Sequence, residues 1–271
     1  MRQPGRVGEN VLWQRIISAL VGIPLILIAV WYGGAALLIL IGIITILGIR
    51  EMMQILARLG LKPVSWLGVI GCLILLGGTY LHTEGYPVSA ITIILFLHLI
   101  ATVVFYPGYS LLDSAGTLMS TLYVGLLSYL YLIRSLPDGA IWLLYMLLCT
   151  WACDTLAYIF GMSFGKRKIV PRLSPNKTLA GSLGGLAGSI LTSLIFAYIY
   201  PFLSMPKLLL LGLLVGLAAE VGDLLESAFK RQAGVKDTSM IIPGHGGILD
   251  RFDSSLFTAP LVYNYVLLFL I

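Results

Sequence analysis

Residues 206–229 read PKLLLLGLLVGLAAEVGDLLESAF. This apolar run is long enough to cross a bilayer as a helix, because a span needs about 20 predominantly apolar residues. It nevertheless contains three acids, Glu220, Asp223 and Glu226. Ionisable side chains inside membrane helices are costly and usually mark a functional site. The run therefore predicts both a membrane-spanning fold and a polar site within it.

The whole chain has the composition of a helical membrane protein. Of its 271 residues, 59% are hydrophobic and 11% are charged, and the mean hydropathy is +0.98. A soluble domain carries about 25% charged residues. The apolar stretches are continuous and do not alternate, which favours helices over a barrel. The three cysteines all lie in such stretches and indicate no disulfide framework. We expect an all-α, polytopic membrane protein.

Apolar runs predict about nine transmembrane helices. They cover residues 16–32, 34–50, 66–82, 88–106, 115–133, 139–161, 181–200, 206–229 and 254–271. The first two are short for a full crossing, and no small-residue cleavage site follows the first, so we expect it to be retained. Residues 1–135 are expected to form a scaffold, with Glu51 at a helix end and Asp113 in a solvated turn. Residues 136–271 are expected to form the catalytic region.

Basic residues predict the orientation in the membrane. If the N-terminus is inside, fifteen of the 17 Lys and Arg residues fall on one side, and Arg134 and Lys207 fall on the other. Cytoplasmic loops are enriched in Lys and Arg, so the crowded side, together with the N-terminus, is expected to be cytoplasmic. The polar segments 162–180 and 230–253 then share this side, and the sequence predicts that they converge on one site.

The acids of the run 206–229 define a polar stripe. At 100° per residue, four small or polar side chains fall within about 60° of one another: Gly216, Glu220, Asp223 and Ser227. Asp223 lies about 12 Å, or roughly two turns, from Arg231. A buried carboxylate at that depth must be paired, protonated or metal-bound, and a pair with Lys230 or Arg231 is the structural alternative. Glu226 is off the stripe and is expected to face the membrane interface.

Residues 227–253 read SAFKRQAGVKDTSMIIPGHGGILDRFD and concentrate charge in a chain that otherwise avoids it. Asp250 and Asp253 are three residues apart at the start of the last predicted span, so they project from adjacent positions of a helical turn. Capping and the helix dipole account for one acid there, but not for two acids after a Gly-rich turn. Asp223 and Asp250 come from different helices, and they are predicted to hold Mg²⁺ together.

Two segments have the composition of phosphate-binding loops. In the first, glycines allow the backbone to approach a phosphate closely and to donate to it; these are Gly246 and Gly247. The second, residues 164–185, reads FGKRKIVPRLSPNKTLAGSLGG and places a cation and hydroxyls before a helix N-terminus; the residues are Ser174, Asn176, Lys177 and Thr178. It lacks P-loop spacing, and its other basic residues are interpreted as determinants of topology.

Asp154 lies inside the predicted span 139–161 and shares a helix face with Tyr158. We interpret it as a residue of the site; the alternative is a hydrogen bond to a neighbouring helix. Small residues at intervals of four predict a face for helix packing: Gly181, Gly185 and Ser189.

The pattern S-x2-K-R-x4-K-D-x5-P-G-H-G-G-x2-D-R-x-D, found here at 227–253, resembles the signature of the phosphatidate cytidylyltransferase, or CDP-diacylglycerol synthase, family. The segments around Asp154 and residues 174–178 are also similar to that family, which commonly has two lysines where Asn176 and Lys177 stand. The specific resemblance covers about residues 139–271.

This resemblance implies Mg²⁺-dependent transfer of CMP from CTP to phosphatidic acid, with release of pyrophosphate, at a bacterial-type plasma membrane. The implied residues are Asp223 and Asp250 as metal ligands, Glu220 and Asp253 as supporting acids, and Lys177, Lys236 and Arg251 as phosphate-binding cations. His245 is expected to donate to a phosphate or to assist the departing pyrophosphate. A monovalent cation such as K⁺ and a homodimer are further expectations from the family; no nucleic-acid partner is expected.

Two other classes fit parts of the pattern. Gly-interrupted helices with intramembrane acids are also found in transporters, but here the polar groups cluster at one end and no internal repeat is evident. Another lipid phosphotransferase is the second alternative, although the DG-x2-AR-x8-G-x3-D-x3-D pattern of alcohol phosphotransferases is absent.

The predicted topology can be tested with single cysteines. Cysteines near positions 60, 170 and 240 should react only with a maleimide that reaches the cytoplasmic side, and those near 84, 136 and 204 only with external reagent. Intact cells and inside-out vesicles, each treated with a membrane-impermeant maleimide, provide the comparison. External labelling at position 170 would contradict the nine-span topology.

Overall fold

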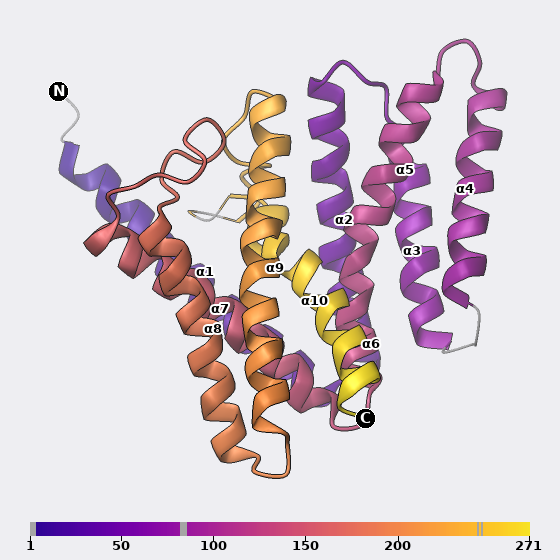
Figure 1. Cartoon of the computed structure of the whole chain (residues 1–271). Coiled ribbons are helices and arrows are strands. Elements are labelled where there is room, and N and C mark those ends of the chain that lie inside the picture. Colours follow the sequence, from indigo (N-terminus) through magenta and orange to yellow (C-terminus); the bar gives the residue numbers. More distant parts are fainter. Residues whose placement is uncertain (1–3, 82–85, 243, 245) are drawn as a thin grey trace. The chain divides into compact units, whose positions relative to one another are not determined.

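The computed structural model describes residues 4–81, 86–242, 244 and 246–271. All regular structure in this part of the chain is helical, apart from two isolated β-bridges (Figure 1). The prediction of an all-α fold is therefore confirmed. The helices are α1 (Pro4–Tyr32), α2 (Gly34–Arg58), α3 (Ser65–Leu81), α4 (Tyr86–Val104), α5 (Leu111–Gly125), the 3₁₀ turn η1 (Leu126–Ser128), α6 (Tyr129–Ser135), α7 (Gly139–Phe164), α8 (Leu179–Ile199), α9 (Met205–Gln232) and α10 (Leu249–Phe269).

Each predicted apolar run coincides with helical structure, but some boundaries differ. Helix α2 contains 25 residues and is long enough for a crossing, contrary to the prediction. The apolar part of α1, Ile16–Tyr32, is one of the shorter apolar helices, as predicted. Helix α2 continues to Arg58, and Glu51 consequently lies inside this helix and not at its end. Position 84, proposed above for labelling, and His245 lie outside the described residues.

Five helical stretches of the described chain are long and apolar enough to cross a membrane. They cover Gly34–Arg58, Leu111–Ser135, Gly139–Phe164, Leu179–Ile199 and Met205–Gln232. Shorter apolar helices cover Ile16–Tyr32, Ser65–Leu81 and Val88–Val104. The chain is therefore a multi-pass helical membrane protein.

The chain forms two compact units. Unit 1 consists of Met1–Gly125 and Gln232–Phe252, and unit 2 consists of Leu126–Arg231 and Asp253–Ile271. The segment 232–252 belongs to the predicted catalytic half, yet it packs with the N-terminal helices. The functional division at residue 135 into scaffold and catalytic region stays a prediction.

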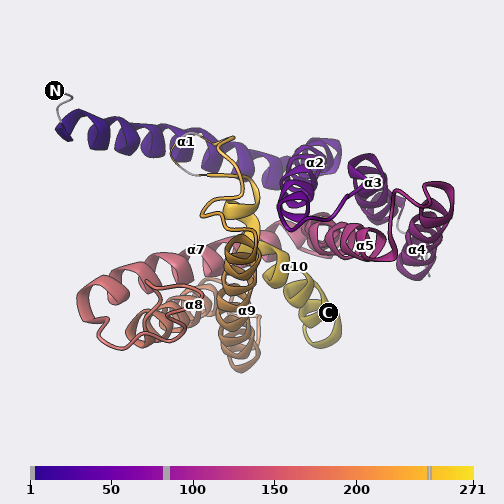
Figure 2. The ribbon, with the colours of Figure 1, turned by 90° about the horizontal axis from the view of Figure 1, so that it is seen from above.

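Within unit 1, helices α2, α3, α4 and α5 form a bundle in which α3 and α5 pack against each other and each contacts α2 and α4 (Figure 2). Close approach is possible because Gly71 of α3 lies against Thr121 of α5, where any Cβ would collide with the threonine methyl group. Asp113 is buried, and its carboxylate accepts hydrogen bonds from the N–H groups of Lys62, at 2.7 Å, and Ser110, at 2.8 Å. The prediction of a solvated turn residue is wrong, because this carboxylate ties the loop after α2 to the start of α5.

Within unit 2, glycines allow α8 to pack closely on α7. A Cβ at Gly181 would lie 2.9 Å, and one at Gly185 3.1 Å, from backbone carbonyl oxygens of α7. Further along α8, Ser189 faces α9, where a Cβ at Gly216 would lie 2.5 Å from the serine hydroxyl. The predicted packing face of α8 is therefore confirmed. It holds the start of α8, and the loop before it, close to α7 and α9.

Candidate active site

Lys177, in the loop before α8, contacts the polar part of α9. Its Nζ lies 2.8 Å from Asp223 Oδ2 and donates a hydrogen bond to the carbonyl oxygen of Glu220 at 3.1 Å. The Asp223 side chain is 38% exposed, so this ion pair occupies a partly open position. The structure thus brings together a predicted phosphate-binding cation and a predicted metal ligand.

A tight loop holds Lys177 in place. Residues 168 and 178 form an antiparallel bridge, and backbone hydrogen bonds of 3.2 and 2.9 Å close the loop between residues 167 and 179. Thr178 is the N-cap of α8, and its side chain accepts a hydrogen bond from Gly181 N–H at 3.1 Å. The predicted helix N-terminus beside Lys177 is therefore confirmed, and the Thr178 hydroxyl oxygen serves this cap.

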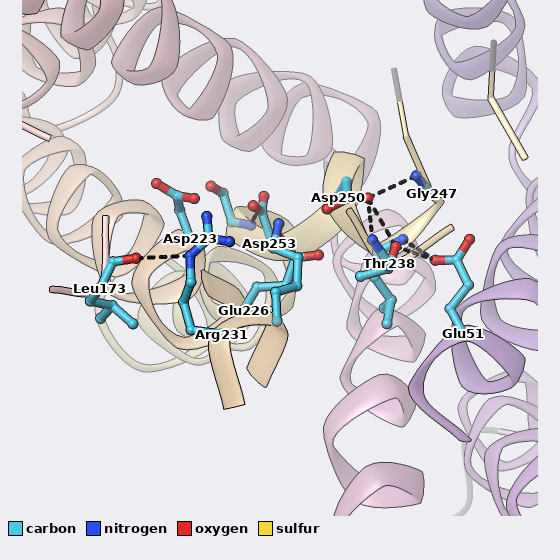
Figure 3. A network of polar contacts seen from close by, with 12 residues as sticks. Glu51, Leu173, Asp223, Glu226, Arg231, Thr238, Gly247, Asp250 and Asp253 are labelled. Atoms are coloured by element: carbon cyan, nitrogen blue, oxygen red, sulfur yellow. Dashed lines mark hydrogen bonds and ion pairs between the residues drawn. The ribbon is translucent and has the colours of Figure 1, made fainter. Parts of the chain in front are cut away.

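Glu226 and Lys230 form a buried ion pair further along α9. Lys230 Nζ lies 3.0 Å from Glu226 Oε2, and the Glu226 side chain is 1% exposed. The prediction that Glu226 faces the interface is wrong, because Lys230 at i+4 neutralises it inside the unit. Asp253 of α10 lies beside Asp223 and Glu226 (Figure 3). Helix α10 comes this close because a Cβ at Gly222 of α9 would lie only 2.6 Å from the backbone oxygen of Asp253.

The acids of unit 2 offer carboxylate oxygens, the ligand type that Mg²⁺ prefers. Mg²⁺ is usually held by one or two carboxylates together with water and substrate phosphates, and not by a complete protein cage. Among the described residues, no three His, Cys, Asp or Glu side chains are grouped as a complete metal site would require. Glu220 Oε1 is buried and has no hydrogen-bond partner among the described residues. A buried carboxylate oxygen without a donor is a group that a bound cation stabilises.

Asp154 of α7 belongs to the same region of unit 2. Its neighbour in the sequence, Cys153, is buried and lies near Glu220 and Lys177. The Asp154 side chain is exposed in unit 2. This placement agrees with the interpretation of Asp154 as a site residue, which stays a prediction.

Asp250 stands in the first turn of α10 and belongs to unit 1. Its Oδ2 accepts hydrogen bonds from the N–H groups of Thr238, at 2.9 Å, and Gly247, at 2.8 Å. Gly246 has a φ of +83°, and a Cβ there would lie 2.7 Å from Asp250 Oδ2. The Gly-rich turn therefore folds around this carboxylate. The two cations predicted in the same segment are exposed: Lys236 and Arg251.

Glu51 of α2 holds the same loop, although the sequence did not single it out. Its side chain is fully buried. Oε1 accepts hydrogen bonds from Ser239 Oγ at 2.5 Å and Ile248 N–H at 2.9 Å, and Oε2 accepts from Thr238 Oγ1 at 3.0 Å and Leu249 N–H at 2.8 Å. Figure 3 shows Glu51 pointing at Thr238. An acid within an apolar helix indicates a functional or structural role, so the sequence did contain a signal for Glu51. Its partners could not be predicted, because they are almost 200 residues away in the sequence.

The predicted site residues thus fall into two groups. Unit 2 contains Asp154, Ser174, Asn176, Lys177, Thr178, Glu220, Asp223 and Asp253. Unit 1 contains Lys236, Gly246, Gly247, Asp250 and Arg251. The joint magnesium site of Asp223 and Asp250 takes one acid from each unit and stays a prediction.

Comparison with known proteins points to one family, because the family match and the similar proteins agree. A model described as "Cytidylyltransferase family" matches residues 13–269. A Staphylococcus haemolyticus protein named phosphatidate cytidylyltransferase is 36% identical over 253 residues, which cover 91% of this chain and 94% of that protein. Proteins of the same name from Staphylococcus aureus (strain COL) and Staphylococcus saprophyticus are 35% and 33% identical, over 91% and 92% of this chain and 94% and 96% of theirs.

The contacts of Lys177 predict that it differs in importance from the other lysines of its loop. Lys177→Ala should lower the rate of the cytidylyl transfer implied by the resemblance about 10- to 100-fold, because a charge-assisted hydrogen bond to substrate is lost. Lys166→Ala and Lys168→Ala, which remove exposed side chains, should cost little. Steady-state rates of the three purified variants provide the measurement. Equal losses would mean that the loop acts as a diffuse positive patch.

Proposed function

The chain belongs to the cytidylyltransferase family, and we propose that it transfers CMP from CTP to phosphatidic acid within a membrane, producing CDP-diacylglycerol and pyrophosphate. The main support is the family match, which spans residues 13–269 and therefore includes both groups of site residues. The name shared by the relatives supplies the lipid substrate. The pair of Lys177 with Asp223 supports the same reaction, since it places a phosphate-binding cation beside an acid suited to a metal ion.

This reaction depends more on neutralising the negative charges of the two substrates than on a general base. A phosphate oxygen of phosphatidic acid attacks the α-phosphorus of CTP, the bond from that phosphorus to the oxygen bridging the β-phosphate breaks, and pyrophosphate leaves with the electron pair. The attacking oxygen is already anionic, so the obstacle is its repulsion by the triphosphate. Cations placed where negative charge develops lower such a barrier. In this proposal, Lys177, Lys236 and Arg251 bind the phosphates, and His245 donates to a phosphate or to the departing pyrophosphate.

We propose that Asp223 and Asp250 hold Mg²⁺, with Glu220 and Asp253 in support. When bound, this ion would neutralise phosphate oxygens of the substrate. The buried Glu220 Oε1 supports the assignment, because an acceptor without a donor suits a cation. Asp154, Ser174, Asn176 and the Gly246–Gly247 turn complete the proposed binding site. A monovalent cation and a homodimer belong to the proposal on the family resemblance alone.

We also propose nine crossings, a cytoplasmic N-terminus and a site open to the cytoplasm of a bacterial-type plasma membrane. The partition of fifteen basic residues against two supports this orientation. A site about two turns below the surface suits the two substrates, because CTP enters from water while the acyl chains of phosphatidic acid stay in the bilayer.

A single assay tests the reaction. The purified protein, incubated with CTP labelled at the α-phosphate, phosphatidic acid and Mg²⁺, should move the label into the lipid fraction and release pyrophosphate in equal amount. A phosphatase would release inorganic phosphate without CTP, and a transporter would leave CTP intact. Either of these results, with no labelled lipid, would contradict the proposed transfer.

Removing either proposed metal ligand should nearly abolish the transfer. Asp223→Asn and Asp250→Asn keep the shape of the side chain but remove the charge that Mg²⁺ requires, so a loss of at least about 100-fold is expected. The matched control is Asp138→Asn, at an exposed loop residue with a φ of 53°, a conformation that Asn tolerates well. Rates are measured at saturating Mg²⁺ on protein that stays folded in detergent. Near-normal activity of either ligand variant would refute its assignment.

A further inference from the structure

Glu51 is a buried acid that the proposed reaction does not use. It lies inside α2, among buried apolar neighbours such as Met52 and Ile55. No Lys or Arg of the described chain forms an ion pair with it. Removing a carboxylate from water is costly unless hydrogen bonds replace those of the solvent. The Glu51 carboxylate therefore needs hydrogen-bond donors from the protein. The segment before α10 and the start of that helix supply them.

The loop places four donor groups within hydrogen-bond distance of Glu51. Two come from hydroxyl groups, those of Ser239 and Thr238, and two from the N–H groups of Ile248 and Leu249. The two N–H groups stand at the start of α10, where the first amides of a helix have no partner inside the helix. Glu51 thus acts as a distant cap for α10, and its negative charge is favourable at that end of the helix dipole.

The same loop determines the orientation of Asp250. Thr238 N–H and Gly247 N–H donate to Asp250 Oδ2, and Thr238 Oγ1 lies 2.9 Å from that oxygen and 3.0 Å from Glu51 Oε2. A hydroxyl carries one hydrogen, so Thr238 donates to one acid at a time while its oxygen faces the other. One residue therefore links the two carboxylates.

The loop fits closely around Glu51 because residue 247 is glycine. A Cβ at Gly247 would lie 2.6 Å from both Glu51 carboxylate oxygens and would collide with the Thr238 hydroxyl. All residues of this arrangement belong to unit 1. The network is therefore a self-contained part of one compact unit.

We propose that Glu51 is a positioning residue for the transfer reaction: it fixes residues 238–239 and 247–248 and the first turn of α10, so that Asp250 is held in one orientation before substrate binds. Each Glu51 oxygen has two donor groups of the loop within hydrogen-bond distance, so the loop surrounds the carboxylate. Glu51 is thus occupied by the loop and acts on substrate only through Asp250. The catalytic part of this inference rests on the function proposed above.

Glu51→Gln tests the proposal, since it keeps the size of the side chain but replaces one acceptor by an N–H₂ group facing Leu249 N–H or Ile248 N–H. Hydrogen exchange of full-length protein in detergent, followed by mass spectrometry, should show peptides covering 238–250 exchanging on the order of 10-fold faster. The kcat for transfer should fall about 10- to 100-fold, the Mg²⁺ concentration at half-maximal rate should rise, and KM for CTP should change little.

Asp113→Asn is the matched control. Asp113 is also a buried acid of unit 1 that accepts hydrogen bonds from backbone N–H groups, but it does not contact the loop. This variant should lower the unfolding temperature while leaving exchange at 238–250 and kcat close to wild type. A loss of kcat in Asp113→Asn as large as that in Glu51→Gln would overturn the proposal, because general destabilisation would then explain both.

A second pair of variants covers the case in which Glu51→Gln does not fold. Thr238→Val removes the shared hydroxyl at nearly constant shape and should lower kcat and speed exchange, whereas Thr238→Ser keeps the hydroxyl and should restore both. Unchanged exchange in Glu51→Gln and in Thr238→Val, or faster exchange with kcat within twofold of wild type, would overturn the inference. A wild-type protein without transfer activity would contradict the proposed function instead, and the exchange data would still decide whether Glu51 holds the loop.

Discussion

A carboxylate removed from water must be given donors or a cation, and this requirement organises the polar parts of the protein. Glu226 is paired with a lysine on its own helix, Asp223 with a lysine from a preceding loop, and Glu51 with neutral donors from a distant loop. Glu226 finds its partner within its own helix, whereas Asp223 and Glu51 take theirs from loops. The loops therefore fold where the buried acids require them, and the polar site results from that arrangement.

Helix α10 shows how closely spaced acids acquire different surroundings. Asp250 and Asp253 are one helical turn apart. Asp250 accepts hydrogen bonds from the Gly-rich loop of unit 1, whereas Asp253 lies beside the acids of α9 in unit 2. The first environment fixes a carboxylate with dipoles, and the second gathers negative charge that favours a cation. Two acids that look equivalent in the sequence therefore have different surroundings in the structure.

The sequence predicted what depends on local patterns. Apolar runs marked the helices, because a continuous stretch of such residues has few other ways to satisfy its backbone in a membrane. The residues around Lys177 predicted the start of α8 and the position of this lysine just before it. Lys230 at i+4 was a local indication that Glu226 is buried in an ion pair. The prediction relied instead on the polar stripe of the helix, which does not include Glu226. Glu51 was missed because its donors follow 187 to 198 residues later, and no local pattern reports such a partner. The predicted second span ended at residue 50, whereas α2 continues to Arg58.

The distance in sequence between Glu51 and its donors also has a consequence for biosynthesis. When α2 leaves the ribosome, the segment that will neutralise its acid has not yet been made. Until residues 238–249 emerge, this carboxylate must remain hydrated near the membrane surface or carry a proton, since neither the lipid nor the neighbouring apolar helices can replace water. The N-terminal helices therefore wait in an incomplete state through most of translation, and the last polar loop completes their burial.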